Sequence, residues 1–377
     1  MDLGRMRGMS LLTASNLFIR PHVLEELKMA NTRRSSSQIV QTYLRQAVVI
    51  AGFASLAVGL LLVVWRPWFF FSYASLFIAA LVLSIVAMAQ KRVWLGLTLL
   101  LLTITVPPTV FLVWHAPVAD TAFRPPIEKP AYPIGQGPMV LIDEAHSNFH
   151  TATGRYLPFA DLLRRDGYVV RASAAQFTAK ALEAGRVLVM ANAVAALTTE
   201  EVAVVRDWVA GGGSLLLIAD HPPFDTAAKD LGKAFGVRFS DGTAVDPNDS
   251  SDHLVFRRSD GTLMDHLITK GIDEVATFTG TSFQVDATGQ PLLVFGPAVY
   301  LWQENDTNPR SLKGHLQGAV LPFGKGRVAV FGEAAMFSAQ RTRLDRTPMG
   351  MNASIAKQNP QFLLNVMHWL TWLDEQH

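Results

Sequence analysis

Three long apolar runs, placed in series near the start of the chain, constrain its fold more than any other feature. They cover residues 46–65, 68–89 and 93–114. At about 20 residues, an apolar helix crosses a hydrocarbon core of roughly 30 Å. Tryptophans stand at or near the ends of the runs, where their rings favour the membrane interface. The sequence therefore predicts three transmembrane helices in the lipid bilayer.

The composition supports this prediction, because only 17% of the 377 residues are charged, fewer than in an ordinary soluble protein. The alternative is three buried helices of a soluble core, and a series of three such runs fits it poorly. The start of the protein has two candidates. Translation from Met1 gives a polar leader of residues 1–45, and Met29 opens a second possible start.

Basic residues predict the orientation of these helices. The leader carries seven Lys or Arg and three Asp or Glu, and Lys91-Arg92 separates the second run from the third. Short basic segments stay in the cytoplasm. Both segments are therefore expected inside, and everything after residue 114 outside the cytoplasm, on a multi-pass protein of the plasma (inner) membrane. No cleavable signal peptide is predicted, because the first apolar run begins too late.

Charge and cysteine content limit what the protein can bind and which chemistry it can carry out. From residue 116 onward there are 23 basic and 28 acidic residues, which argues against nucleic acid as a partner. The sequence contains no cysteine, so disulfides, thiolate metal sites and a cysteine nucleophile are excluded. Residues 116–138 contain six prolines, which predict a stiff linker that lifts the following domain off the bilayer.

Residues 139–377 alternate between strand and helix patterns. We predict strands at 139–142, 168–172, 186–191, 214–219 and 327–331, and helices at 155–165, 178–184, 198–210, 224–235 and 360–374. Strands that alternate with helices indicate a parallel sheet covered on both faces. Residues 237–322 are less regular and predict an insertion with strands of mixed direction, followed by a turn at 321–326.

Polar clusters follow three of the predicted strands: Asp143, Glu144 and His146, then Asp220 and His221, then Glu333. Parallel strands bind ligands beyond their carboxyl ends, so we expect these six side chains to line one site. Carboxylates with imidazoles suit general acid–base chemistry, with His146 or His221 as acid or base, or a divalent metal ion. The alternative is that the carboxylates cap helices, and no metal-binding motif such as HExxH is present.

The segments GGGSLLLIADH, VLIDEAH and VAVFGEAAMF resemble the class I glutamine amidotransferase-like superfamily. More narrowly, residues 138–375 resemble its uncharacterised membrane-associated branch, related to domains of intraflagellar-transport and trehalose-utilisation-type proteins. The resemblance implies a flavodoxin-like α/β fold. True amidotransferases carry a Cys, a His and a Glu. Here the corresponding turn reads Ala219-Asp220-His221-Pro222-Pro223, so thiol-based glutamine hydrolysis is excluded.

Two functions remain open from the sequence. In the first, the outward-facing domain binds a small polar or carbohydrate-like ligand of the cell envelope, and if it is an enzyme it hydrolyses that ligand with carboxylate and His groups. In the second, the protein is a non-catalytic scaffold or transport accessory whose partners are other membrane proteins. Small residues in the first apolar run, such as Gly52 and Gly59, would suit helix contacts in that case.

Overall fold

The computed structural model describes residues 117–248, 253–303, 308–342 and 346–373. These residues belong to one compact unit, which begins at Trp114. The leader and the three predicted transmembrane helices lie outside the described residues. Within the described part, no helix combines the length and the apolar character that crossing a membrane requires.

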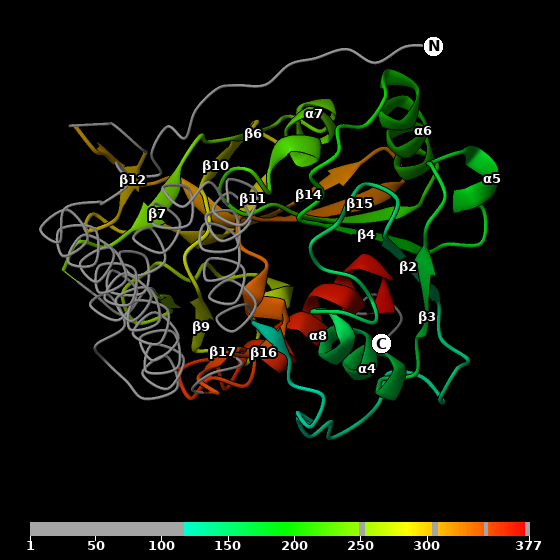
Figure 1. Cartoon of the computed structure of the whole chain (residues 1–377), viewed down its shortest axis with the longest axis horizontal. Helices are drawn as coiled ribbons and strands as arrows, with labels where there is room; N and C mark the ends of the chain where they lie inside the picture. Colours follow the sequence, from blue (N-terminus) through cyan, green and yellow to red (C-terminus); the bar gives the residue numbers. More distant parts are fainter. Residues whose placement is uncertain (1–116, 249–252, 304–307, 343–345, 374–377) are drawn as a thin grey trace, which may run out of the picture. The chain divides into compact units, whose positions relative to one another are not determined.

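A mixed, mostly parallel sheet forms the centre of this α/β domain (Figure 1). Five neighbouring strands run parallel: β3 (Val169–Ser173), β2 (Met139–Asp143), β4 (Val187–Ala191), β5 (Ser214–Ile218) and β15 (Gly326–Phe331). Strands β4 and β5 are buried at every residue, as expected for strands that are covered on both faces. When these five strands are numbered 1 to 5 along the chain, their order across the sheet is 2-1-3-4-5. Flavodoxin-like sheets have the same order. The order reverses between β2 and β4, and ligands bind at such switch points.

Helices cover both faces of the sheet. On one face lie α4 (Leu157–Arg165) and α8 (Asn359–Leu370), and on the other α5 (Ala179–Leu182), α6 (Thr199–Ala210) and α7 (Thr226–Ala234). Alternate residues of β2 reach the two cores: Val140 and Ile142 enter the first, and Leu141 enters the second. This alternation is the period of two that a strand imposes on its side chains. The predicted helices and parallel strands therefore exist, with ends shifted by a few residues.

The sheet continues past β15 with antiparallel strands. Strand β14 (Leu316–Phe323) pairs with β15, then come β10 (Phe283–Val285) and β6 (Val237–Phe239), and β11 (Gln290–Val294) also pairs with β14. The predicted turn at 321–326 was therefore wrong at its start, because β14 runs on through Pro322 to Phe323. Gly324, at a φ of 59°, makes the turn instead.

Smaller strands and two short 3-10 helices surround this sheet. They are β1 (Val118–Ala119), β7 (Thr243–Val245), β8 (Leu254–Arg257), β9 (Glu274–Thr277), β12 (Tyr300–Trp302), β13 (Arg310–Ser311), β16 (Ala339–Arg341), β17 (Pro348–Gly350), η1 (Leu267–Thr269) and η2 (Ala335–Phe337). The proline-rich segment before β2 lies along the domain. Its β1 pairs with β16, and its Tyr132 ring packs edge-on to Tyr168 at 5.3 Å.

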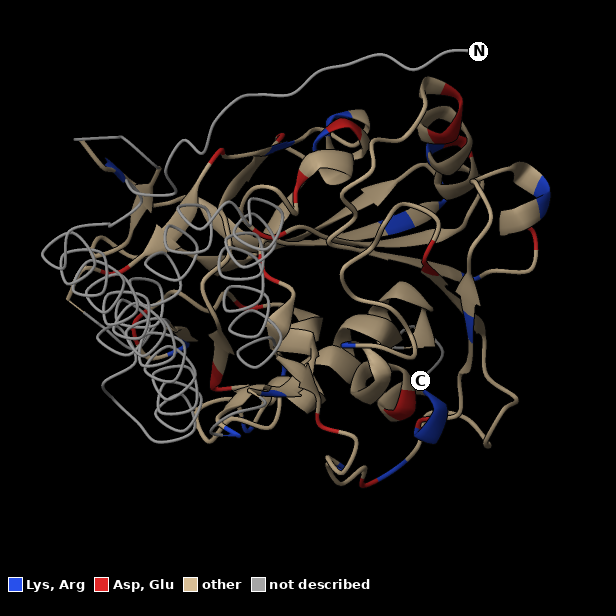
Figure 2. Ribbon diagram, in the orientation of Figure 1, with Lys and Arg blue, Asp and Glu red and all other residues tan. Residues whose placement is uncertain are grey.

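Charged residues lie mainly on helices and loops, whereas the central strands carry few of them (Figure 2). The exceptions are informative, because a buried carboxylate requires partners that compensate for its lost hydration. Asp143 and Glu333 are fully buried, and Glu201 and Asp220 are nearly so. All four lie towards the carboxyl ends of the parallel strands or on the loops and helix that follow them.

Candidate functional site

The carboxyl edge of the parallel strands collects the predicted polar residues, in two groups. Asp143 ends β2, while Asp220 and Glu333 follow β5 and β15 by two residues each. Two asparagines stand between the groups. The Asn148 side chain donates to Asp143 Oδ2 at 2.9 Å, and the Asn192 side chain accepts from the Asp220 backbone N–H at 3.0 Å.

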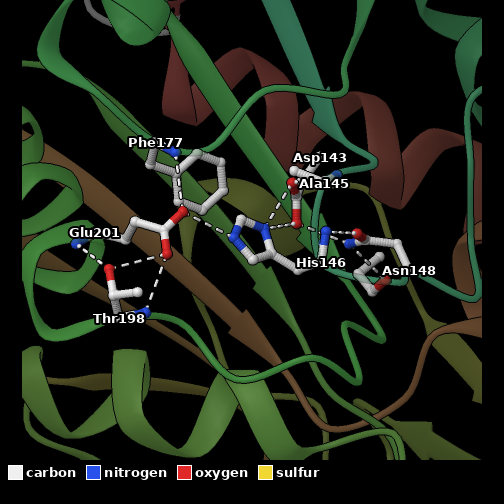
Figure 3. A network of polar contacts seen from close by, with 8 residues as sticks. Asp143, Ala145, His146, Asn148, Phe177, Thr198 and Glu201 are labelled. Carbon is white, nitrogen blue, oxygen red and sulfur yellow. Dashed lines mark hydrogen bonds and ion pairs between the residues drawn. The ribbon is translucent and has the colours of Figure 1, made fainter.

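His146 is the centre of the first group (Figure 3). Its Nδ1 lies 3.0 Å from both carboxylate oxygens of Asp143, and its Nε2 lies 3.1 Å from Glu201 Oε1. The Phe177 ring packs against the imidazole at a centroid distance of 4.7 Å. A nearly buried imidazole is thus held between two carboxylates.

The charges of this group are set by its hydrogen bonds. The bond to Asp143 raises the pKa of His146 above its ordinary value, and the bond to Glu201 adds to this effect, although burial opposes it. Burial alone would raise the pKa of Glu201, but hydrogen bonds from Thr198, His146 and Phe177 together lower it. Both ring nitrogens of His146 face carboxylates, so the ring links β2 to α6, and the two carboxylates favour its cationic form.

Glu201 was not among the predicted site residues. Its Oε2 accepts from the backbone N–H and hydroxyl of Thr198 at 3.0 Å each, and its own N–H donates to Thr198 Oγ1 at 3.2 Å. This is a capping box at the start of α6. The spacing Thr-x-x-Glu was visible in the sequence as a helix start, but nothing there indicated that the same carboxylate also reaches His146.

Asp220 and Glu333 form the second group, on the neighbouring strands β5 and β15. The Glu333 carboxylate accepts from the backbone N–H groups of Ala335 at 2.5 Å and Met336 at 2.7 Å. Asp220 accepts from the N–H groups of His221 and Ala334. The buried Tyr156 donates its hydroxyl to the Ala334 carbonyl at 3.0 Å. Ala334 thus contacts both Asp220 and Tyr156 beside Glu333.

Burial is the main influence on the pKa values of this pair. Burial raises the pKa of Asp220, although the His221 ring and hydrogen bonds oppose the shift. Burial also raises the pKa of Glu333 well above its usual range, and the neighbouring Asp220 raises it further. Both carboxyl groups therefore hold a proton more readily than an exposed carboxyl group does. A protonated carboxyl group can donate a hydrogen bond, and an ionised one accepts.

The remaining two predicted residues lie at the margins of these groups. Glu144 accepts from the Ala152 backbone N–H at 2.8 Å, so it fixes the loop that follows β2. His221 is partly exposed, with Nε2 at 3.8 Å from Asp220 Oδ1. Its ring lies 5.7 Å from Phe224. Glu144 and Glu333 thus satisfy backbone N–H donors of the residues that follow them.

Strained backbone gathers at the same edge. Ser147, Asn192 and Thr279 have φ values of 54°, 47° and 77°. Such values are uncommon for side chains other than glycine, above all for a β-branched one. Gly280 follows at 93°. A Cβ there would collide with the Gly332 carbonyl and come within 2.7 Å of Glu333 Cβ. Strain of this kind concentrates at functional sites.

A divalent metal ion was one expectation for these carboxylates and imidazoles. Within the described residues, no group of three or more His, Asp or Glu side chains is arranged to hold a metal ion. In the first group His146 already occupies both carboxylates. In the second group backbone N–H donors occupy oxygens of Glu333. The geometry therefore suits proton transfer and hydrogen bonding better than metal ligation.

Comparison with solved structures finds similar but distant chains. The mmIFT52 N-terminal domain is 15% identical, covers 62% of this chain and 97% of its own, and has a TM-score of 0.48. Cytoplasmic Protein STM3548 from Salmonella typhimurium is 12% identical, with coverages of 62% and 99% and a TM-score of 0.41. A beta-galactosidase from Bacillus circulans sp. alkalophilus is 12% identical, with coverages of 63% and 31% and a TM-score of 0.36.

Comparison with protein families is more definite. No curated protein matches the sequence. One family model, described as a domain of unknown function, matches residues 155–355, which include α4, both carboxylates of the second group and most of the sheet. The chain therefore belongs to the DUF4350 family of domains of unknown function.

Proposed function

We propose that the carboxyl edge of the sheet binds a small, polar, hydroxyl-bearing ligand, in the manner of a carbohydrate-binding site. The observation that carries this proposal is the buried pair Asp220 and Glu333 on adjacent strands, with the pKa of each carboxyl raised by burial. A protonated and an ionised carboxyl group side by side offer a donor and an acceptor, which a hydroxyl group matches. Asp220 is the ligand-facing member, because Glu333 is fully buried.

Aromatic side chains beside Asp220 support this ligand class. The Phe149 side chain is 42% exposed, and its ring lies 4.7 Å from that of Phe224. The His221 ring contacts Phe224 in turn. Small-molecule sites combine aromatic walls with a few placed polar groups. The apolar face of a sugar ring stacks on such rings while its hydroxyl groups reach the carboxylates.

If the ligand is hydrolysed, Asp220 is the group for the proton transfer. A carboxyl group with a raised pKa retains a proton to give to a leaving group, and its conjugate base then accepts one from water. Burial keeps the Asp220 pKa high, and Asp220 in turn raises the pKa of Glu333 beside it. Thiol chemistry has no part in the proposal, because the sequence has no cysteine.

The three apolar runs supply the setting for this proposal. They would anchor the protein in the plasma membrane and hold the domain on the outer side. The ligand would then come from the cell envelope. The Lys91-Arg92 turn and the basic leader support this orientation.

The proposal is tested with the full-length protein by saturation-transfer NMR against neutral sugars, sugar acids and amino acids. We expect at least one hydroxylated probe to bind the wild type and to lose its signal with Asp220→Asn. Asp207→Asn is the matched control, because Asp207 is exposed on α6. No bound probe, or a signal that Asp220→Asn leaves unchanged, contradicts the proposal.

A scaffold role is the second candidate. The observation in its favour is that Glu144 and Glu333 satisfy backbone N–H groups, so part of the predicted site has a structural task. In that role the partners would be other membrane proteins. Asp220→Asn would then leave every association of the protein intact.

A further inference from the structure

His150 lies beside the second group and lacks the partners that a buried imidazole normally has. Its side chain is 3% exposed, and neither ring nitrogen makes a hydrogen bond to any residue that the structure describes. Its ring instead packs against Tyr156 at 4.6 Å and Phe149 at 5.9 Å. Buried polar atoms without partners are rare in native proteins, because each one loses its bonds to water.

The surroundings of His150 keep it neutral. Burial lowers its pKa to about 3, and the positive charge of Arg155 contributes to the shift. A neutral imidazole has one N–H donor and one acceptor nitrogen. Both are therefore available to a ligand that reaches this part of the site.

Arg155 is the second unusual residue. Its guanidinium lies over the Phe149 ring, 3.6 Å from the centroid. Burial lowers its pKa to about 10, so it stays charged at neutral pH. Among the described residues it has no ion-pair or hydrogen-bond partner, whereas the half-buried Arg341 pairs with Asp120 at 2.6 Å. A partly desolvated guanidinium is suited to a carboxylate or phosphate, which it binds through two parallel hydrogen bonds.

Tyr156 connects these two residues to the carboxyl pair. It follows Arg155 directly in the chain, its ring packs on His150, and its hydroxyl bonds to Ala334 beside Glu333. The charges of Glu333 and Asp220 both act on the Tyr156 hydroxyl. The cationic and the acidic parts of this edge are thus separated by one side chain.

We infer that His150 and Arg155 form an anion-binding subsite, and that the ligand of this edge is a hydroxylated small molecule with one carboxylate or phosphate group. The inference rests on the proposed function, because Asp220 contacts the hydroxyl groups of the same ligand. Arg155 binds the anionic group through its planar fork, and His150 donates the further hydrogen bond. A sugar acid and a sugar phosphate both have this chemistry.

Isothermal titration of the full-length protein with D-glucuronate, D-glucose 6-phosphate and D-glucose tests the inference. We expect one of the two anions to bind at least about tenfold more tightly than glucose. Arg155→Met and His150→Phe should each weaken anion binding about ten- to hundredfold. Arg155→Lys keeps the positive charge but not the planar guanidinium. Its affinity for the anion should lie between those of the wild type and Arg155→Met. Arg171→Met is the matched control, because Arg171 is exposed on the edge strand β3.

The outcomes separate this inference from the proposed function. The anion subsite is overturned if glucose binds with the same affinity as both anions, or if Arg155→Met leaves the affinity for the anion unchanged. This holds even if Asp220→Asn abolishes binding. Anion binding that is lost in Arg155→Met but survives Asp220→Asn supports the subsite and removes the role of the carboxyl pair. Binding of none of the three probes contradicts the inference. Unfolding midpoints of all variants distinguish lost contacts from lost folding.

Discussion

At the residue scale, two buried histidines four positions apart have opposite electrostatic surroundings. His146 lies between Asp143 and Glu201, and its pKa is raised. His150 lies beside Arg155, and its pKa is lowered to about 3. Burial lowers the pKa of both rings. At His146 the hydrogen bonds and charges of the two carboxylates outweigh burial, whereas at His150 the charge of Arg155 adds to it. We infer that His146 stabilises the fold and that His150 binds a ligand.

Replacing His150 should therefore stabilise the protein. His150→Phe keeps a ring against Tyr156 and removes two buried nitrogens that have no partner in the described chain. We expect the free energy of unfolding to rise by about 1–3 kcal/mol, measured by urea denaturation at neutral pH. A loss of similar size would mean that the nitrogens have partners in the folded protein without ligand.

His146 should make the stability depend on pH. A histidine whose pKa is raised on folding stabilises the native state fully below its unfolded value of about 6.5. This contribution disappears as the pH rises through the folded value. The unfolding free energy should therefore fall above about pH 6.5 in the wild type, and less so in His146→Gln. Denaturation curves at several pH values measure this. A stability that rises over the same range excludes the cationic link.

At the element scale, a glycine sets the distance between α6 and β15. A Cβ at Gly326 would collide with the carbonyl oxygens of Val209 and Gly213. We expect Gly326→Ala to reduce the unfolding free energy by about 1–3 kcal/mol, because backbone atoms cannot yield as side chains do. Gly296→Ala is the control, since its Cβ would meet only Thr262 Cγ2 at 3.7 Å. Equal stability of the two variants would show that β15 shifts freely against α6.

The elements that the sequence predicted best are those with a clear period or a clear start. Residues 139–142 and 215–219 form uninterrupted apolar runs, and these runs supply most of the buried residues of strands β2 and β5. The start of the predicted helix at residue 198 coincides with Thr198, which is the N-cap of α6. Strand β14 was not predicted. Its last residues were assigned to a turn because Pro322 and Gly324 resemble one, although pairing with β15 keeps Pro322 within the ladder.

The candidate site was predictable in its location but not in its partners. The carboxyl ends of parallel strands lie at the same edge of a sheet whatever the strand order is, so Asp143, Asp220 and Glu333 share that edge. Pairing across long sequence distances was not predictable, because Glu201 reaches His146 from a helix that begins 53 residues later. The unpaired state of His150 depends on packing around Tyr156, which no local pattern records.

At the scale of the whole molecule, the predicted membrane topology has its own test. An alkaline phosphatase fusion after His377 should be active, because this reporter folds only outside the cytoplasm. The physical reason is the basic leader and the Lys91-Arg92 turn, which favour the cytoplasmic side. A green fluorescent protein fusion at the same position is the complementary control. Fluorescence there without phosphatase activity would reverse the location of the domain.

The central claim is that the carboxyl edge of the sheet binds the ligand. The most direct test is an experimental structure of the full-length protein with D-glucuronate or D-glucose 6-phosphate, whichever binds more tightly. We expect the sugar hydroxyl groups to contact Asp220 and the anionic group to contact Arg155 and His150. A competing location exists, a surface pocket of about 520 Å³ lined by Arg258, His266 and Lys270. The anion bound in that pocket, with the sheet edge unchanged, would contradict the central claim.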